Sequence, residues 1–100
     1  MYLDKYTKEI NALCIQHKVK SLYVFGSVLT DRFSEQSDID LVVDIDVNDP
    51  LDYADRYFDL KFALEDLLNR QIDLLENKAI KNPYFLKNLE SSKSLLYASW

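Results

Sequence analysis

Two aspartates at alternate positions, Asp38 and Asp40, are the residues of this sequence with the clearest capacity for chemistry. Successive side chains of a β-strand point to opposite faces, so in an extended segment both carboxylates share one face while Ile39 faces a core. Two adjacent carboxylates repel each other and lose hydration near a core, which raises their pKa values unless a cation lies between them. The pair therefore predicts a site for a divalent metal ion.

A third carboxylate, Asp73, is the one charged residue inside a later apolar run. A strand over 71–76 that lies beside the Asp38 strand would point Asp73 to the same edge. Carboxylate oxygens suit Mg²⁺ or Mn²⁺, and two such ions about 3.5 to 4 Å apart stabilise the attacking and departing oxygens of a displacement at phosphorus. The three aspartates thus predict phosphoryl or nucleotidyl transfer. Asp38 and Asp40 would hold the metal that accompanies a triphosphate, and Asp73 would complete the second metal site.

The dipeptide Gly26-Ser27 stands where the apolar run 22–25 stops, shortly before the aspartates. Glycine lets the backbone approach a ligand closely, and a helical turn opening there would offer free N–H groups to a phosphate. We therefore expect Gly26 and Ser27 to contact the terminal phosphates of a nucleotide.

The elements that must position these residues follow from the spacing of apolar side chains. Helices are predicted over 3–17, 51–68 and 81–97, strands over 21–25, 38–45 and 71–76, and one or two helical turns after Gly26. Asp49 is predicted to cap the middle helix, with Pro50 near its first position. This order predicts an α+β or α/β sandwich, a small mixed β-sheet packed against helices, in one domain over 1–100.

Composition narrows the function classes. The chain has 100 residues, 48% apolar, and a net charge of −5. Acidic residues crowd the segment 38–59, and such a surface repels a polyanion, which argues against a nucleic-acid partner. Most of the acids after residue 43 are interpreted as a solvated helix face plus an N-cap. No apolar run is long enough for a membrane span and no signal peptide is evident, so we expect a cytoplasmic protein.

Two further residues have simple structural interpretations. Cys14 lies at helical spacing with Ile10 and Leu13, which favours a small buried apolar residue over a catalytic or metal-binding thiol. His17 ends the first predicted helix, where a positive imidazole would complement the negative helix end, and this is favoured over a ligand role.

The motif residues resemble a known family over nearly the whole chain. Phe25-Gly26-Ser27, followed by Ser37-Asp38-Ile39-Asp40-Leu41-Val42-Val43 and by Asp73, resembles the minimal nucleotidyltransferases of the DNA polymerase β superfamily. The resemblance implies a nucleotidyltransferase fold that uses ATP or another NTP with two Mg²⁺ ions, or Mn²⁺. It implies that Gly26, Ser27 and Ser37 bind the nucleotide and that Asp38, Asp40 and Asp73 ligate metal. It further implies a HEPN-domain partner, the toxin of a toxin–antitoxin pair, with a tyrosine that becomes adenylylated.

One segment departs from the family pattern. Many relatives continue Gly-Ser with an arginine-containing run that ends in glycine, whereas this sequence has Val28-Leu29-Thr30-Asp31. Arg32 could supply the missing cation from a loop of different shape.

Two function classes stay open at this stage. The preferred one is an enzyme that moves AMP from ATP to a hydroxyl of a partner protein. The alternative is a weakly catalytic or non-catalytic binding module that neutralises its partner by sequestration through the aromatic terminal segment, 81–97. That segment could equally complete the core. A small-molecule transferase ranks third because it usually needs a further acceptor-binding domain.

Leftover aromatic surface favours a homodimer or a heteromeric complex over a monomer.

Overall fold

A mixed four-stranded sheet forms the centre of the computed structural model, which describes residues 1–99. Its strands are β1 (Val19–Phe25), β2 (Ile39–Ile45), β3 (Ile72–Glu76) and β4 (Ser94–Ala98), in the spatial order β3-β2-β1-β4. β1 is antiparallel to β2 and to β4, whereas β2 and β3 are parallel. A parallel pair needs a crossover connection, which the long helix α2 (Pro50–Leu68) supplies. The predicted α+β sandwich with a small mixed sheet is confirmed.

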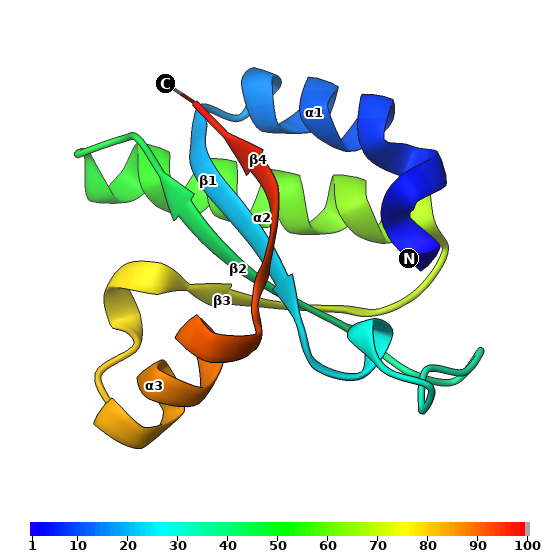
Figure 1. Cartoon of the computed structure of the whole chain (residues 1–100). Coiled ribbons are helices and arrows are strands. Elements are labelled where there is room, and N and C mark those ends of the chain that lie inside the picture. The colour runs from blue at the N-terminus through cyan, green and yellow to red at the C-terminus, as the bar shows by residue number, and fades with distance from the viewer. Residues whose placement is uncertain (100) are drawn as a thin grey trace.

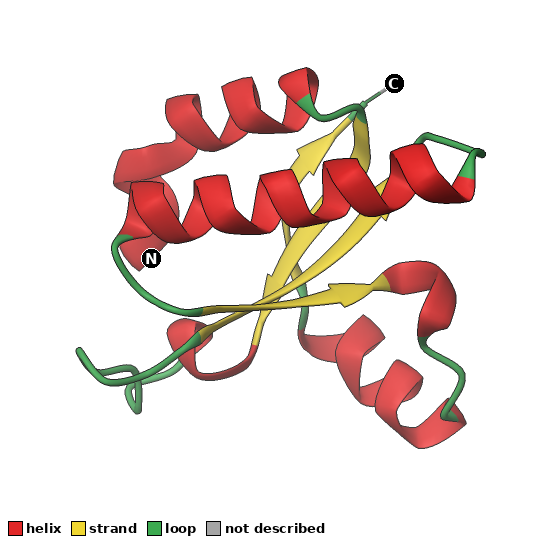
Figure 2. Cartoon of the chain, turned by 180° about the vertical axis from the view of Figure 1, so that it is seen from behind, coloured by secondary structure: helices red, strands yellow, loops and turns green. Residues whose placement is uncertain are grey.

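Helices α1 (Thr7–Gln16) and α2 cover one face of the sheet, as both views of the chain show (Figure 1, Figure 2). Alternate residues of the strands point toward these helices and are buried, while the residues between them face the other side. The buried core comprises Ile10, Cys14, Leu22, Val24, Ile39, Leu41, Val43, Ile45, Leu60, Leu64, Leu68, Ile72 and Leu74, among others. The aspartates of the sequence motif therefore lie on the face that α1 and α2 leave open.

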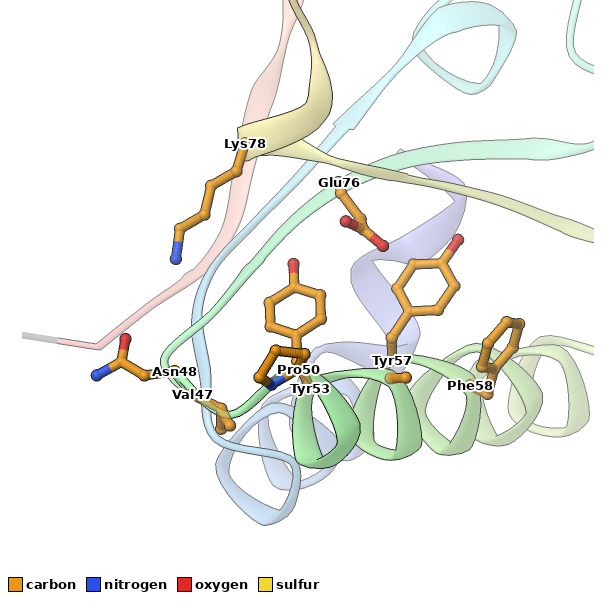
Figure 3. A pocket seen from close by; sticks show the side chains of 9 residues that line it. Val47, Asn48, Pro50, Tyr53, Tyr57, Phe58, Glu76 and Lys78 are labelled. Carbon is orange, nitrogen blue, oxygen red and sulfur yellow. The ribbon is translucent and has the colours of Figure 1, made fainter.

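The two long helices start and end close to their predicted bounds. The first predicted helix is divided into a 3-10 turn, η1 (Tyr2–Tyr6), and α1. Pro50 occupies the first position of α2, and Asn69 ends the helix in the left-handed conformation at φ 49°. Within the described residues Asp49 makes no side-chain capping bond, so the predicted cap is wrong, although the residue does hold the N-cap position. Figure 3 shows Tyr53 and Tyr57 rising from the N-terminal half of α2 toward β3.

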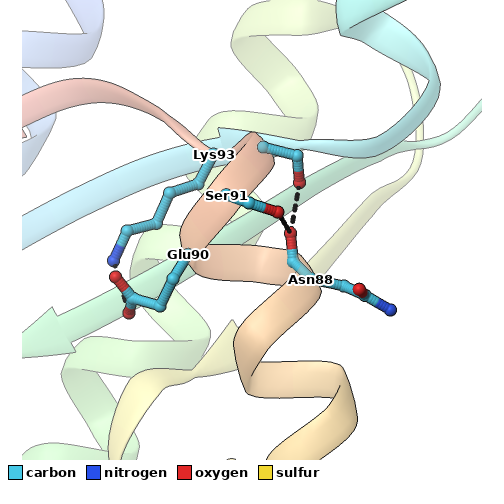
Figure 4. Close-up of polar contacts among 5 residues, drawn as sticks. Asn88, Glu90, Ser91 and Lys93 are labelled. Carbon is cyan, nitrogen blue, oxygen red and sulfur yellow. Dashed lines mark hydrogen bonds and ion pairs between the residues drawn. The ribbon is translucent and has the colours of Figure 1, made fainter.

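The C-terminal segment differs from the single helix predicted over 81–97. Helix α3 (Pro83–Ser92) begins with an N-cap, the side chain of Asn82 accepting bonds from the backbone N–H groups of Tyr84 and Phe85, and ends after only ten residues. At its end the hydroxyl of Ser91 donates to the carbonyl oxygen of Asn88 at 2.9 Å (Figure 4). Serine hydroxyls that bond back to helix carbonyls compete with continued helix, and Lys93 adopts an extended conformation.

The residues after this break form β4 instead of a helix. β4 pairs with β1 through partners such as Leu22 with Tyr97 and Val24 with Ser94. The exposed edge of β1 offers unpaired backbone groups, and β-branched and aromatic neighbours favour pairing over a solvated helical turn. The last predicted helix is thus correct for its first half and wrong for its second. No helix in the described range is long and apolar enough to cross a membrane.

Candidate active site

Asp40 lies at the centre of the motif residues. In the sheet it is aligned with Asp73 on the parallel strand β3 and with Phe25 on the antiparallel strand β1. Residues aligned across neighbouring strands share a face of the sheet, so the side chains of Asp40, Asp73 and Phe25 all belong to the open face. The sheet register therefore brings together two carboxylates that are 33 positions apart in the sequence.

Gly26 lies against the carboxylate of Asp40. Its φ of +80° is in the left-handed region, and a Cβ atom at this position would lie 2.3 Å from Asp40 Oδ2. Glycine alone accommodates both the conformation and the contact. The close approach predicted for Gly26 thus involves a carboxylate of the site itself.

Asp40 is placed in unfavourable electrostatic surroundings. Partial burial raises the pKa of its carboxyl, and the charges of Asp73 and Asp38 raise this pKa further. Asp38 precedes β2 and is exposed, as is Asp73. Three negative charges within electrostatic reach, one of them partly desolvated, create a demand for a cation.

The donor set suits a hard cation that is shared with a substrate. Among residues 1–99 no group of three or more His, Cys, Asp or Glu side chains is close enough together to enclose a metal ion by itself. Mg²⁺ typically takes one or two protein carboxylates and fills its remaining positions with water and substrate phosphates. The aligned pair Asp40 and Asp73, next to the backbone of Gly26, fits that kind of site.

The loops around the aspartates are held by their own hydrogen bonds. Gly26 opens the 3-10 turn η2 (Gly26–Leu29), in which Ser27 accepts bonds from the backbone N–H and the hydroxyl of Thr30, both at 2.9 Å. The Ser37 hydroxyl accepts from the backbone N–H of Ser34 at 3.1 Å. Ser27 and Ser37 are both half-buried, and both belong to the loops that flank Asp40.

Arg70, which the sequence analysis did not identify as a functional residue, holds the loop before Asp38. Its Nη1 donates to the carbonyl oxygens of Ser34 at 2.9 Å and Ser37 at 2.7 Å. Its guanidinium carbon lies 4.5 Å from the ring centroid of Phe33 and 4.8 Å from that of Tyr2. These contacts fix the backbone directly before Asp38. The available signal was a planar cation with five hydrogen-bond donors directly before the strand predicted over 71–76. Arg32, expected as a substitute cation, lies exposed in the loop.

Cys14 and His17 lie away from the aspartates on the α1 side. Cys14 is fully buried and its thiol pKa is raised to about 12 by burial, which confirms the structural interpretation. His17 is 8% exposed at the end of α1, and burial lowers its imidazole pKa. The lowered pKa weakens the match of a positive imidazole to the helix end, and that match stays a prediction.

Comparison with known proteins agrees with this geometry. Residues 8–99 match the sequence model of the polymerase beta nucleotidyltransferase family. A predicted protein adenylyltransferase of Methanocaldococcus jannaschii, MJ0128, is 40% identical over 82% of this chain and 79% of its own length.

Solved structures extend the agreement to the fold. A predicted minimal nucleotidyltransferase aligns with a TM-score of 0.72 at 29% identity, covering 93% of this chain and 91% of the other. The MNT antitoxin complex with the tri-AMPylated HEPN toxin of Shewanella oneidensis aligns with a TM-score of 0.62 at 20% identity, covering 93% of this chain and 70% of the other. The second likeness shows a shared fold.

Proposed function

The chain belongs to the polymerase β nucleotidyltransferase family, and from this premise we propose that it transfers AMP from ATP to a hydroxyl group of a partner protein. Relatives at 36 to 40% identity carry the name protein adenylyltransferase, which supports a protein acceptor. The acidic surface supports the same choice over a nucleic acid, because it repels a polyanion.

The observation that carries the proposal is the alignment of Asp40 with Asp73 beside Gly26. In the proposed roles Asp38, Asp40 and Asp73 hold Mg²⁺, while Gly26 and Ser27 contact the phosphates and Ser37 helps to bind the nucleotide. When bound, Mg²⁺ neutralises the triphosphate and lowers the pKa of the acceptor hydroxyl. The protein's own contribution is to place oxygen donors on one rigid face of the sheet and to keep their loops in position.

The reaction exchanges one phosphorus–oxygen bond for another. The acceptor oxygen bonds to the α-phosphorus of ATP, the bond from that phosphorus to the bridging oxygen breaks, and pyrophosphate leaves. The acceptor proton passes to a carboxylate or to water. Asp73 is exposed on the open face and is therefore accessible to an acceptor hydroxyl that arrives from solvent.

For the partner we propose a HEPN-domain toxin that this chain, as antitoxin, modifies and neutralises in the cytosol. The Shewanella oneidensis complex of a tri-AMPylated HEPN toxin with an MNT antitoxin, which shares this fold, supports this choice. Sequestration without transfer is the competing outcome.

A mass measurement tests the proposal. The chain is incubated with ATP, Mg²⁺ and a HEPN-domain protein as acceptor, and the mass of the acceptor is measured by mass spectrometry. Wild type and the control Glu9→Gln, an exposed acid of α1, should add adenylyl groups. The double variant Asp38→Asn/Asp40→Asn should add none while still binding the partner. If wild type adds no mass but the partner is bound and neutralised, transfer is refuted in favour of sequestration.

A further inference from the structure

A second concave site lies on the helix-covered side of the sheet, separate from the aspartates. A cavity of about 500 Å³ opens between the start of α2 and the end of β3 (Figure 3). Glu76, at the end of β3, is aligned with the buried Val43, so it faces α2. Asp73 lies three positions earlier in the strand and faces the opposite side. The proposed transfer chemistry therefore makes no use of this cavity.

Aromatic rings form the walls of the cavity. Tyr53, Tyr57 and Phe58 of α2 line it. The Tyr57 hydroxyl donates to the carbonyl oxygen of Leu74 at 2.5 Å, and its ring meets Phe58 edge-to-face with centroids 5.0 Å apart. These contacts hold two of the rings in fixed orientations before any ligand arrives.

The charge inside the cavity is negative. Figure 3 shows Glu76 pointing from β3 toward the space between the two tyrosine rings. Burial, then the charges of Glu76 and Asp44, raise the pKa of Tyr53 to about 12. Lys78 also lines the cavity, but its Nζ lies 3.4 Å from Asp44 Oδ1, so its charge is already opposed. Among residues 1–99 Glu76 has no ion-pair partner, and aromatic faces beside such a carboxylate are the surroundings that bind an organic cation.

The outer ridge of α2 continues this surface with apolar side chains and acids. Leu51, Phe58 and Phe62 are 77%, 50% and 57% exposed, and the rings of Phe58 and Phe62 are stacked with centroids 6.3 Å apart. At helical spacing Asp55 lies on the same stripe and Asp59 beside it, both exposed. An apolar stripe bordered by acids complements an apolar segment that carries basic residues.

We propose that this cavity and the Leu51–Phe62 ridge of α2 dock a basic, apolar segment of the partner protein, with one arginine or lysine side chain inserted between Tyr53 and Tyr57 opposite Glu76. The inference rests on the proposed function in taking the acceptor protein as that partner. It assigns recognition to the helix side of the molecule and transfer to the open face of the sheet.

A small-molecule probe tests the cation site without the partner. N-acetyl-arginine amide and N-acetyl-lysine amide are titrated into the isotope-labelled chain, with the neutral isostere N-acetyl-citrulline amide as control. We expect saturable NMR shifts of the Tyr53, Tyr57 and Phe58 rings with one or both cations, none with citrulline, and none in Glu76→Gln. The exposed α1 variant Glu9→Gln should respond as wild type. Equal shifts from the citrulline and arginine compounds, or no shifts at all, would overturn the cation site.

Titration of the HEPN partner separates docking from transfer. Glu76→Gln and Phe58→Ala should each weaken binding about tenfold or more, and adenylylation by these variants should show a raised KM for the partner with kcat retained. Asp40→Asn should bind as wild type and transfer nothing. If Glu76→Gln and Phe58→Ala, with wild-type melting temperatures, bind as tightly as wild type, the docking site is refuted while transfer stands. If wild type fails to adenylylate but these variants bind weakly, transfer is refuted and the docking site stands.

Discussion

Replacing Gly26 with alanine should disable the site while leaving the fold in place. The added Cβ would lie 2.3 Å from Asp40 Oδ2, about 1 Å inside ordinary contact. Asp40 stands on β2 between two paired strands, so its backbone cannot retreat, and its side chain must leave the present rotamer. The carboxylate is therefore displaced from its place opposite Asp73.

The expected magnitudes follow from two contributions. An alanine held at φ +80° costs about 1–2 kcal/mol, and an Asp40 side chain forced off its rotamer costs about 0.5–1.5 kcal/mol more. A loss of about 1.5–3.5 kcal/mol corresponds to a fall in melting temperature of roughly 6–28 °C for a chain of this size. A displacement of about 1 Å in a group that positions substrate costs on the order of 100-fold in rate.

The assay pairs thermal unfolding with the adenylyl-transfer measurement. Asn69→Ala is the matched control, because Asn69 is also left-handed, at φ 49°, but ends α2 away from Asp40. It should lower the melting temperature by several degrees, for a cost of about 1 kcal/mol, and leave transfer unchanged. Gly26→Ala should in addition abolish most of the transfer.

A double-mutant cycle tests the contact itself. Asp40→Ala removes Oδ2 and Cγ, the two atoms that lie closer than ordinary contact to a Cβ at residue 26. Gly26→Ala should therefore destabilise the Asp40→Ala background less than it destabilises wild type, by about 0.5–1.5 kcal/mol. Strict additivity of the two substitutions would refute the steric argument. Wild-type transfer by Gly26→Ala would refute the link from that contact to activity.

Three further predictions concern other parts of the chain. Arg70→Met should remove the hydrogen bonds to the carbonyl oxygens of Ser34 and Ser37. Kinetics at varied ATP concentration should then show a KM for ATP raised about tenfold and a nearly unchanged kcat. An unchanged KM would mean that the loop keeps its conformation without Arg70. The pKa of the Asp40 carboxyl is raised in the folded state, so its contribution to stability is present at acidic pH and is lost as the pH rises through that pKa. At pH 7 without Mg²⁺, Asp40→Asn should therefore melt at or above the wild-type melting temperature. This advantage should disappear in acid, and calorimetry across the pH range measures it. Cys14, fully buried with a thiol pKa of about 12, should react with a thiol reagent only at the rate of unfolding, and fast labelling of the native chain would contradict its burial.

Local pattern was sufficient for the elements that carry the motif. Alternation along 38–43 puts Ile39 and Leu41 in the core and Asp40 on the other face, because strand geometry has a period of two residues. Pro50 and an apolar stripe were sufficient for α2, since proline suits a first helical turn and the stripe repeats with the helical period.

The C-terminal segment shows where local pattern fails. The residue types of Leu95, Leu96 and Tyr97 are compatible with a helix or with a strand. Their pairing with the open edge of β1, which is distant in sequence, makes the segment a strand. The cavity beside Glu76 was equally out of reach, because its walls come from α2 and its carboxylate from β3.

The residue types at positions 26, 38, 40 and 73 were sufficient to indicate nucleotide chemistry. Their ability to bind a phosphate or a metal ion depends on the side chains and backbone of a few neighbouring positions. Whether Asp73 stands opposite Asp40 depends on the parallel register of β2 and β3, which the length and packing of α2 set across 33 positions. Folding likewise brings Gly26 into contact with Asp40. It also brings Arg70 within hydrogen-bond distance of the loop that precedes Asp38. Side-chain chemistry is a local property of the sequence, whereas distance between strands is a property of the packed sheet.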